Sequence, residues 1–212
     1  MDLKKTFREK YYVLICFAVM AAAQLICYYI PKAVLGNMTL TVMDTAIDRS
    51  IPLIPCWVIV YVLAYLSWVV SGIIILWDSR EHARRIASAY VLAMIICGIC
   101  FVAFPITMQR PELTGSGFCM DLLRAIYSAD TPLCLCPSLH VLISYICWRG
   151  LSGCGRVPRW FKLFNFVFFV LVCFSVVFVK QHLFMDIPAG IAAGELAMQI
   201  SRFVGPGRAA KQ

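Results

Sequence analysis

Charged side chains are scarce in this sequence. Aspartate, glutamate, lysine and arginine make up 14% of the 212 residues, whereas soluble domains carry about 25%. Hydrophobic residues reach 62%, and the mean hydropathy is +0.83. A chain of this length cannot bury so much apolar surface in one core, and a disordered chain needs more charge. The composition therefore excludes both of these classes and indicates an integral membrane protein.

The sequence also lacks internal repeats, low-complexity stretches and the short alternating segments of a transmembrane β-barrel. Its apolar runs are long and continuous, and a helix needs about 20 apolar residues to cross a bilayer. We therefore expect an all-α polytopic membrane protein, a bundle of six transmembrane helices that forms one membrane-embedded domain over residues 1–212. The predicted spans are Tyr11–Ile30, Leu53–Trp77, Ile86–Met108, Ser138–Arg149, Leu163–Val179 and Ile187–Val204.

Basic residues are concentrated in alternate connections between these spans. They gather in short segments: Lys4, Lys5, Arg8 and Lys10; Arg80, Arg84 and Arg85; Arg149, Arg156, Arg159 and Lys162; and Arg202, Arg208 and Lys211. Cytoplasmic loops collect lysine and arginine, so we expect a multi-pass protein of the cell membrane with both termini in the cytoplasm. The net charge of +8 is then explained by the basic residues of the cytoplasmic segments. Short, scattered basic segments do not indicate nucleic-acid binding.

A few polar residues fall at the opposite, extracytoplasmic ends of the predicted spans, which would be lumenal in a eukaryotic cell. They are Arg110, His140, Lys180, His182 and Asp186. Polar side chains at bilayer depth are costly and are often functional. Of the chain's 3 histidines, two belong to this set. We therefore expect an active site on the extracytoplasmic face.

These residue types suit phosphoryl transfer through a histidine. His182 and Asp186 lie about one helical turn apart, so the carboxylate can orient the imidazole that attacks phosphorus. His140 is the candidate for protonating the leaving alkoxide, because imidazole titrates near neutral pH. These three residues are the predicted catalytic set.

Two cations and a helix start are the predicted phosphate-binding groups. Arg110 and Lys180 would offset the charge on the phosphate oxygens. Backbone N–H groups at the helix that starts at Ser138 would contribute as well. The mechanism needs no metal and no cofactor.

The polar residues also form short motifs in chain order. These are Arg110-Pro111, then Pro137-Ser138-Leu139-His140, then His182 with Asp186. They resemble the three signature motifs of the type 2 phosphatidic acid phosphatase superfamily. The resemblance implies that His182 is the nucleophile, that Asp186 orients it, that His140 protonates the leaving group, and that Arg110 and Ser138 hold phosphate. It also implies a lipid phosphate or phospholipid substrate in the bilayer, with water or an alcohol as acceptor.

Finer features resemble the inositol phosphorylceramide synthase-like branch of that superfamily. They are Phe104-Pro105, the stretch from Tyr127 to Pro132, and Lys180-Gln181-His182. The chain departs from the superfamily pattern at Ala103 and Val176, where lysine and arginine are usual. It departs from the branch at Cys134, where asparagine is frequent. Lys180 is the candidate replacement for a lost cation, without the bidentate geometry of arginine.

Other interpretations of these residues stay open. His140, His182 and Asp186 could hold zinc. The same set could serve as a proton relay in a non-enzymatic transporter of lipids or small molecules. Cys97 and Cys100 have the spacing of thiol oxidoreductases, although they fall in the middle of a predicted span.

Three further features concern the outer loop and the last span. Cys119 could form a disulfide with Cys134 or Cys136 in an oxidising compartment. The segment from Phe118 to Tyr127 predicts an interfacial helix over the site, with Leu122, Leu123 and Ile126 toward lipid. Glu195 lies inside the sixth predicted span, where we expect a hydrogen-bonded structural role.

Overall fold

The computed structural model describes the backbone of residues 3–204 and the side chains of residues 11–203. The longer helices are α1 Leu3–Leu35, α3 Val58–Asp78, α4 Arg80–Ala103, α6 Leu139–Gly153, α7 Arg159–Phe178 and α8 Asp186–Val204. The shorter elements are α2 Ala46–Ser50, the 3-10 helix η1 Pro55–Trp57, α5 Phe118–Ala129, β1 Thr41–Val42 and β2 Ile106–Thr107. Among the described residues, the only strands form one short parallel pair, in which Thr41 faces Ile106.

Several helices are long and apolar enough to cross a membrane. Within residues 3–204 there are 4 of them: Tyr11–Leu35, Pro55–Asp78, Arg80–Ala103 and Arg159–Phe178. Helix α6 has 15 residues, which is short for a span, and α8 carries Asp186, Glu195 and Arg202. The structure therefore supports a membrane protein, while six spans remain a prediction.

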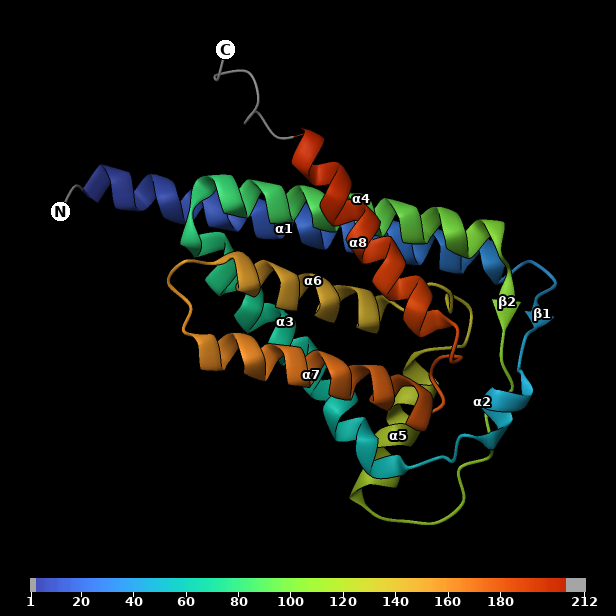
Figure 1. Cartoon of the computed structure of the whole chain (residues 1–212). Coiled ribbons are helices and arrows are strands. Elements are labelled where there is room, and N and C mark those ends of the chain that lie inside the picture. The colour runs from blue at the N-terminus through green and yellow to red at the C-terminus, as the bar shows by residue number, and fades with distance from the viewer. Residues whose placement is uncertain (1–2, 205–212) are drawn as a thin grey trace.

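The orientation of the chain in the membrane also remains a prediction. The side chains of Lys4, Lys5, Arg8 and Lys10, and the whole of Arg208 and Lys211, lie outside the part of the chain that the structure describes. The basic segments that are described, at the starts of α4 and α7 and near the end of α6, lie at one end of the bundle (Figure 1).

One predicted span ends earlier than expected. We predicted that the third span reaches Met108, but α4 ends at Ala103. Phe104, with φ −124° and ψ 80°, precedes Pro105 and is not helical, because a residue before proline avoids the helical region. Ile106 and Thr107 pair instead with the segment that follows α1.

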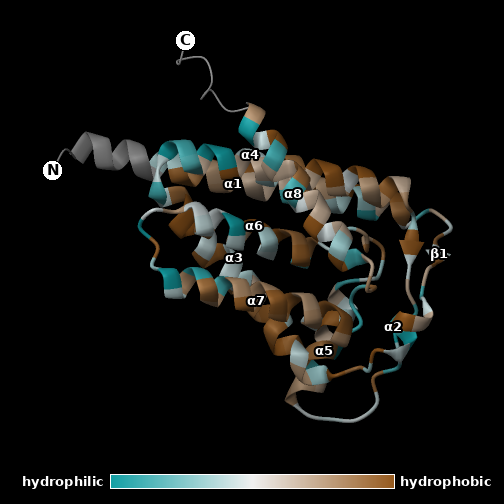
Figure 2. Cartoon of the chain, in the orientation of Figure 1, coloured by the Kyte–Doolittle hydropathy of each residue, from teal (hydrophilic) through white to brown (hydrophobic). Residues whose placement is uncertain are grey.

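The long helices lie side by side, with α1 against α4, while α8 crosses over α4 (Figure 1). At the end of the bundle where α1 and α4 finish, β1 pairs with β2 and α2 follows β1, while α5 lies against η1 and α3 (Figure 1). The first turns of α4 and α7 are hydrophilic and their later turns are mainly hydrophobic (Figure 2). Large hydrophobic side chains such as Leu66 and Leu163 are exposed, as expected of helices that face lipid.

Helix α6 is the buried centre of the bundle. Every side chain from His140 to Cys147 is buried. Helix α8 packs closely on it: a Cβ at Gly190 would lie 2.9 Å from the Ser138 carbonyl oxygen, and one at Gly194 would lie 2.9 Å from the Tyr145 ring. These glycines allow the start of α8 to lie against the start of α6, so two of the sequence motifs meet there.

The predicted interfacial helix is present as α5, but its orientation differs from the prediction. We expected Leu122, Leu123 and Ile126 to face lipid. Leu123 is fully buried, and Leu122 and Ile126 pack with it against residues of α3 and α7. The apolar face of α5 therefore covers the protein rather than the bilayer.

Candidate active site

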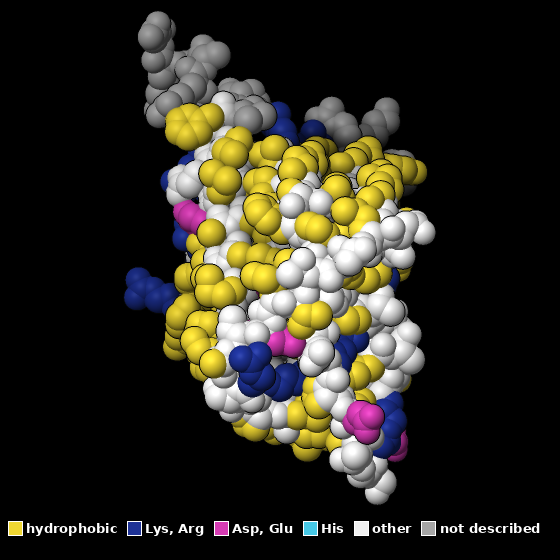
Figure 3. All heavy atoms as spheres, turned by 90° about the vertical axis from the view of Figure 1, so that its right-hand side faces the viewer, with side chains coloured by type: hydrophobic (Ala, Val, Ile, Leu, Met, Phe, Trp, Pro, Cys, Tyr) yellow, Lys and Arg dark blue, Asp and Glu magenta, His cyan; other side chains and the backbone are white. Residues whose placement is uncertain are grey.

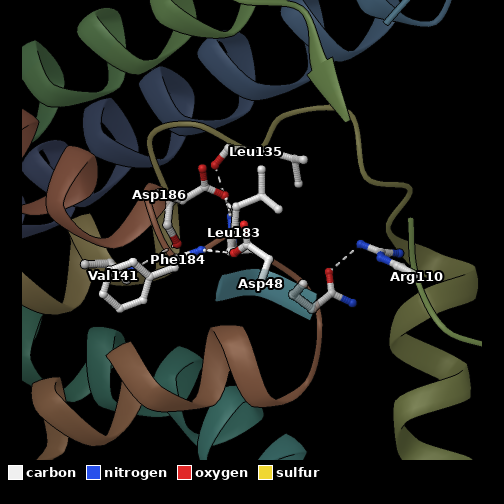
Figure 4. Close-up of polar contacts among 10 residues, drawn as sticks. Asp48, Arg110, Leu135, Val141, Leu183, Phe184 and Asp186 are labelled. Atoms are coloured by element: carbon white, nitrogen blue, oxygen red, sulfur yellow. Dashed lines mark hydrogen bonds and ion pairs between the residues drawn. The ribbon is translucent and has the colours of Figure 1, made fainter. Parts of the chain in front are cut away.

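His182 is fixed in the turn between α7 and α8. Its Nδ1 lies 3.1 Å from Asp186 Oδ2 and 3.0 Å from the Leu135 carbonyl oxygen. Both partners are acceptors, so this geometry requires a proton on Nδ1, and in the neutral ring it leaves the lone pair on Nε2. Asp186 Oδ2 also accepts a 2.9 Å hydrogen bond from the Leu183 N–H, and Asp186 is 1% exposed. Asp186 and Leu135 lie near each other in Figure 4.

His140 lies in the first turn of α6, enclosed by aromatic rings of α3. Its ring stacks on Tyr61 at 3.8 Å and lies 4.9 Å from Trp68 and 5.1 Å from Tyr65. Its Nε2 is buried and has no hydrogen-bond partner among the described residues. The His140 and His182 rings are 6.5 Å apart. A buried nitrogen without a partner requires an explanation, and a bound ligand is one.

Arg110 lies between β2 and α5, over the Tyr127 ring at 4.6 Å. Its guanidinium donates to the Asp130 carbonyl oxygen at 2.5 Å and to Gln181 Oε1 at 2.7 Å, and Figure 4 shows the second of these contacts. Burial lowers the pKa of Arg110. The Asp130 carboxylate pairs with Lys32 at 2.9 Å, and within the described residues Arg110 forms no ion pair. Its positive charge is therefore left for an anion.

Lys180 occupies the left-handed region of backbone space, with φ 53°. This conformation is uncommon for a residue other than glycine. Its Nζ donates to the Asp48 carbonyl oxygen at 2.7 Å and to that of Ile51. Burial lowers the pKa of Lys180, and the nearby Asp48 and Asp44 charges oppose that shift. Two of its three N–H groups thus hold the α2 segment, and one is left for a substrate.

Ser138 is fully buried at the start of α6. Its Oγ accepts a 3.4 Å hydrogen bond from the Val141 N–H, and its own N–H donates to the Asp186 carbonyl oxygen at 3.2 Å. Ser138 therefore caps α6 and joins it to α8. It does not line either of the cavities described next, although its hydroxyl retains a proton to donate.

Two cavities meet at the turn that carries His182. The first, of about 490 Å³, is lined by Arg110, Lys180 and His182 together with residues of the α2 segment. The second, of about 320 Å³, is lined by Arg110, His140, His182 and aromatic side chains such as Tyr61. The structure thus brings Arg110 and His182 together and places Lys180 on one side and His140 on the other. Figure 3 faces this end, where basic and acidic side chains surround a hollow.

Asp48 is a residue of this region that the sequence analysis missed. It is 8% exposed, and its Oδ1 accepts a 2.7 Å hydrogen bond from the Phe184 N–H. Its Oδ2 accepts from the N–H of Thr45 at 2.9 Å. Asp48 therefore ties α2 to the turn between His182 and Asp186 (Figure 4). The capping pattern of Thr45 and Asp48 is readable in the sequence, but the contact with Phe184 spans 136 residues.

Replacing Asp48 with alanine should destabilise the protein, because the Phe184 N–H would lose its partner in a buried position. We expect a loss of about 1–3 kcal/mol in the free energy of unfolding, measured by denaturation in detergent. Asp121→Ala is the matched control, since Asp121 forms an exposed pair with Arg124 and exposed pairs contribute about 0–1 kcal/mol. Equal losses in both variants would contradict the role of Asp48.

Stability should also depend on pH through Asp48. Burial raises its pKa, but the hydrogen bonds from Phe184 and Thr45 and the charge of Lys180 outweigh burial and lower it. A lowered pKa means that this stabilisation is present above the ordinary aspartate pKa of about 4 and is lost as the pH falls. Melting temperatures at decreasing pH should therefore fall more steeply for the wild type than for Asp48→Asn. Parallel curves would contradict this assignment.

Three other predictions concern a metal site, a disulfide of Cys119 and a redox pair of Cys97 and Cys100. The described residues contain no group of three or more histidine, cysteine or acidic side chains placed to hold a metal ion. The cysteines are free thiols, including Cys119, Cys134 and Cys136. The thiol of Cys119 lies next to Cys56 of η1. Cys97 is buried in the core on α4.

The fold and the site together define a helical membrane protein with a buried histidine, aspartate and arginine around two joined cavities. The family described as the PAP2 superfamily matches residues 49–200 of the chain. The chain belongs to this superfamily, and the membership supports a phosphatase-type activity. Comparisons with curated proteins and with solved structures gave no match.

Proposed function

We propose that this protein is a membrane-embedded lipid phosphate phosphatase or phosphotransferase that forms a phosphohistidine on His182. One observation carries the proposal. The two acceptors at Nδ1 leave the His182 Nε2 lone pair for an electrophile, and the adjoining cavity also contains His140, whose buried Nε2 has no partner. Arg110 supplies positive charge to the same cavity. A phosphate between the two imidazoles would satisfy all three groups.

In the first step, His182 Nε2 attacks phosphorus. The N–P bond forms while the P–O bond to the lipid breaks, and the leaving oxygen takes a proton from His140 Nε2. Asp186 accepts the Nδ1–H of His182 and stabilises the positive charge that develops on that ring. The Tyr61 ring, stacked on His140 at 3.8 Å, holds the imidazole in place for this step.

In the second step, the oxygen of water or of an alcohol attacks the phosphohistidine. His140 takes its proton, the N–P bond breaks, and His182 is restored. Water yields free phosphate, and an alcohol yields a new phosphodiester. The resemblance of the Lys180-Gln181-His182 segment to the inositol phosphorylceramide synthase-like branch favours transfer, but a fold-level likeness does not identify the acceptor.

Charge compensation is the proposed role of the remaining groups. Arg110 would bind the phosphate oxygens through its unpartnered Nε and its two terminal nitrogens. The free proton of Lys180 would add a hydrogen bond from the first cavity. Ser138, which lines neither cavity, would hold the start of α6 against α8 rather than bind phosphate itself. We place this site on the extracytoplasmic face, because the described basic segments lie at the other end of the bundle.

The proposal is tested by incubating the purified protein with a panel of lipid phosphates and phospholipids, with and without inositol or diacylglycerol. We expect either free phosphate or a new phosphodiester from at least one donor, and the product identifies the acceptor. A folded protein that yields neither product with any donor, including in its native lipid extract, would contradict the proposal.

Activity should survive chelation, because each step uses only side chains of the chain. We expect the same rate before and after dialysis against EDTA. Loss of activity with EDTA and its recovery with zinc would instead indicate a metal site built from His140, His182 and Asp186.

A further inference from the structure

A second polar cluster lies away from the candidate active site, between the later turns of α6 and of α8. Glu195 accepts a 2.5 Å hydrogen bond from the Tyr145 hydroxyl and pairs with Arg149 at 3.2 Å. Arg149 also donates to the Tyr145 hydroxyl at 3.1 Å, and Gln199 donates to the other oxygen of Glu195. Glu195 therefore has the hydrogen-bonded role expected from the sequence, and none of these groups lines either active-site cavity.

Two more arginines interact electrostatically with this network. Arg85 comes from the second turn of α4, and Arg202 comes from the last turn of α8. Arg202 is close enough to act electrostatically on both Arg85 and Glu195, and Arg149 acts on Arg85. Arg149 and Arg202 thus act on both Glu195 and Arg85, so this cluster of three arginines from three helices contains one carboxylate and keeps an excess of positive charge.

Arg85 has an unmet hydrogen-bonding group in this cluster. Its Nε is buried and has no hydrogen-bond partner among the described residues. Neither Arg85 nor Arg202 forms an ion pair there. Like charges that approach without compensation are unfavourable, and a bound anion would relieve both this repulsion and the unmet hydrogen bond.

We propose that Arg85, Arg149 and Arg202 bind the phosphate of an anionic phospholipid headgroup. Guanidinium groups bind phosphate with paired hydrogen bonds, and basic pockets between transmembrane helices bind such headgroups. Arg85 lies at the start of α4, at the end of the bundle opposite His182 (Figure 1). The site therefore takes a lipid from the leaflet opposite the candidate active site, and it does not depend on the proposed reaction.

The test is a titration of the purified full-length protein in neutral detergent with phosphatidylglycerol, phosphatidylcholine or inorganic phosphate, read out as thermal stabilisation. The double variant Arg85→Gln/Arg202→Gln removes the two unpaired charges. Arg156→Gln/Arg159→Gln is the matched control, because it removes the same charge from exposed positions. Arg110→Gln removes any contribution of lipid bound at the candidate active site.

We expect phosphatidylglycerol to stabilise the wild type more than phosphatidylcholine does. The apparent affinity for phosphatidylglycerol should fall about five-fold for each arginine removed from the cluster, which corresponds to ~1 kcal/mol each. The control variant and Arg110→Gln should keep the wild-type affinity. Glu195→Gln should bind more tightly, because it removes the competing carboxylate. If inorganic phosphate stabilised the protein as much as phosphatidylglycerol does, the ligand would be a free anion and not a lipid. Equal losses of affinity in the cluster and control variants would contradict a binding site at these arginines.

Discussion

Replacing His182 with alanine should lower turnover of a lipid phosphate by about 10⁴-fold or more, because no other group can accept the phosphoryl group in this mechanism. Asp186→Asn should lower it by about 10²–10⁴-fold, since the imidazole would keep its contact with the Leu135 carbonyl oxygen but lose the carboxylate that stabilises its positive charge. Both are measured as initial rates of phosphate release or transfer on purified protein with an unchanged melting temperature.

The matched control for His182→Ala is the same substitution at His82. That histidine lies in the first turn of α4, where its Nε2 contacts the Gly150 carbonyl oxygen. His82→Ala should keep its activity. Full activity in a well-folded His182→Ala variant would exclude His182 as the nucleophile, and equal losses in both histidine variants would point to a general effect on folding.

His140→Gln should lower turnover of a lipid phosphate by about 10²–10⁴-fold, the range that general acid catalysis contributes. The loss should depend on the leaving group. The phenolate of an aryl phosphate leaves without protonation when the phenol is strongly acidic. The first step of the reaction should therefore be slowed far less with such a substrate. The measurement is the burst of phenol released from an aryl phosphate, and of alcohol released from an alkyl phosphate, in the wild type, His140→Gln and His182→Ala.

The two histidine variants should therefore differ with an activated substrate. We expect His140→Gln to retain a burst of the phenol and His182→Ala to show none. If His140→Gln lost activity equally with both kinds of leaving group, its role would be structural, within the stack of Tyr61, Tyr65 and Trp68.

Local spacing in the sequence predicted the parts of the site that are close along the chain. His182 and Asp186 are separated by one turn, and the structure joins them at 3.1 Å. Ser138 was expected to start a helix, and it caps α6. Apolar runs of span length identified the long helices, because the cost of burying polar backbone in lipid leaves few alternatives.

Contacts between distant segments could not be predicted in the same way. Asp48 reaches the Phe184 N–H across 136 residues, and a single aspartate in a predicted loop gives no signal of that contact. Lys180 was expected to face phosphate, but two of its three donors hold backbone carbonyls of the α2 segment. Leu123 faces the protein rather than lipid, because an apolar stripe does not reveal which apolar surface covers it.

The most direct test of this account is to trap the covalent intermediate. The protein is mixed with a ³²P-labelled lipid phosphate and quenched in alkali, where phosphohistidine survives and an acyl phosphate does not. The account predicts label that is lost in acid, that maps to His182 by peptide mass spectrometry and that is absent from His182→Ala. Turnover without any labelled protein, or label on a residue other than His182, would contradict it.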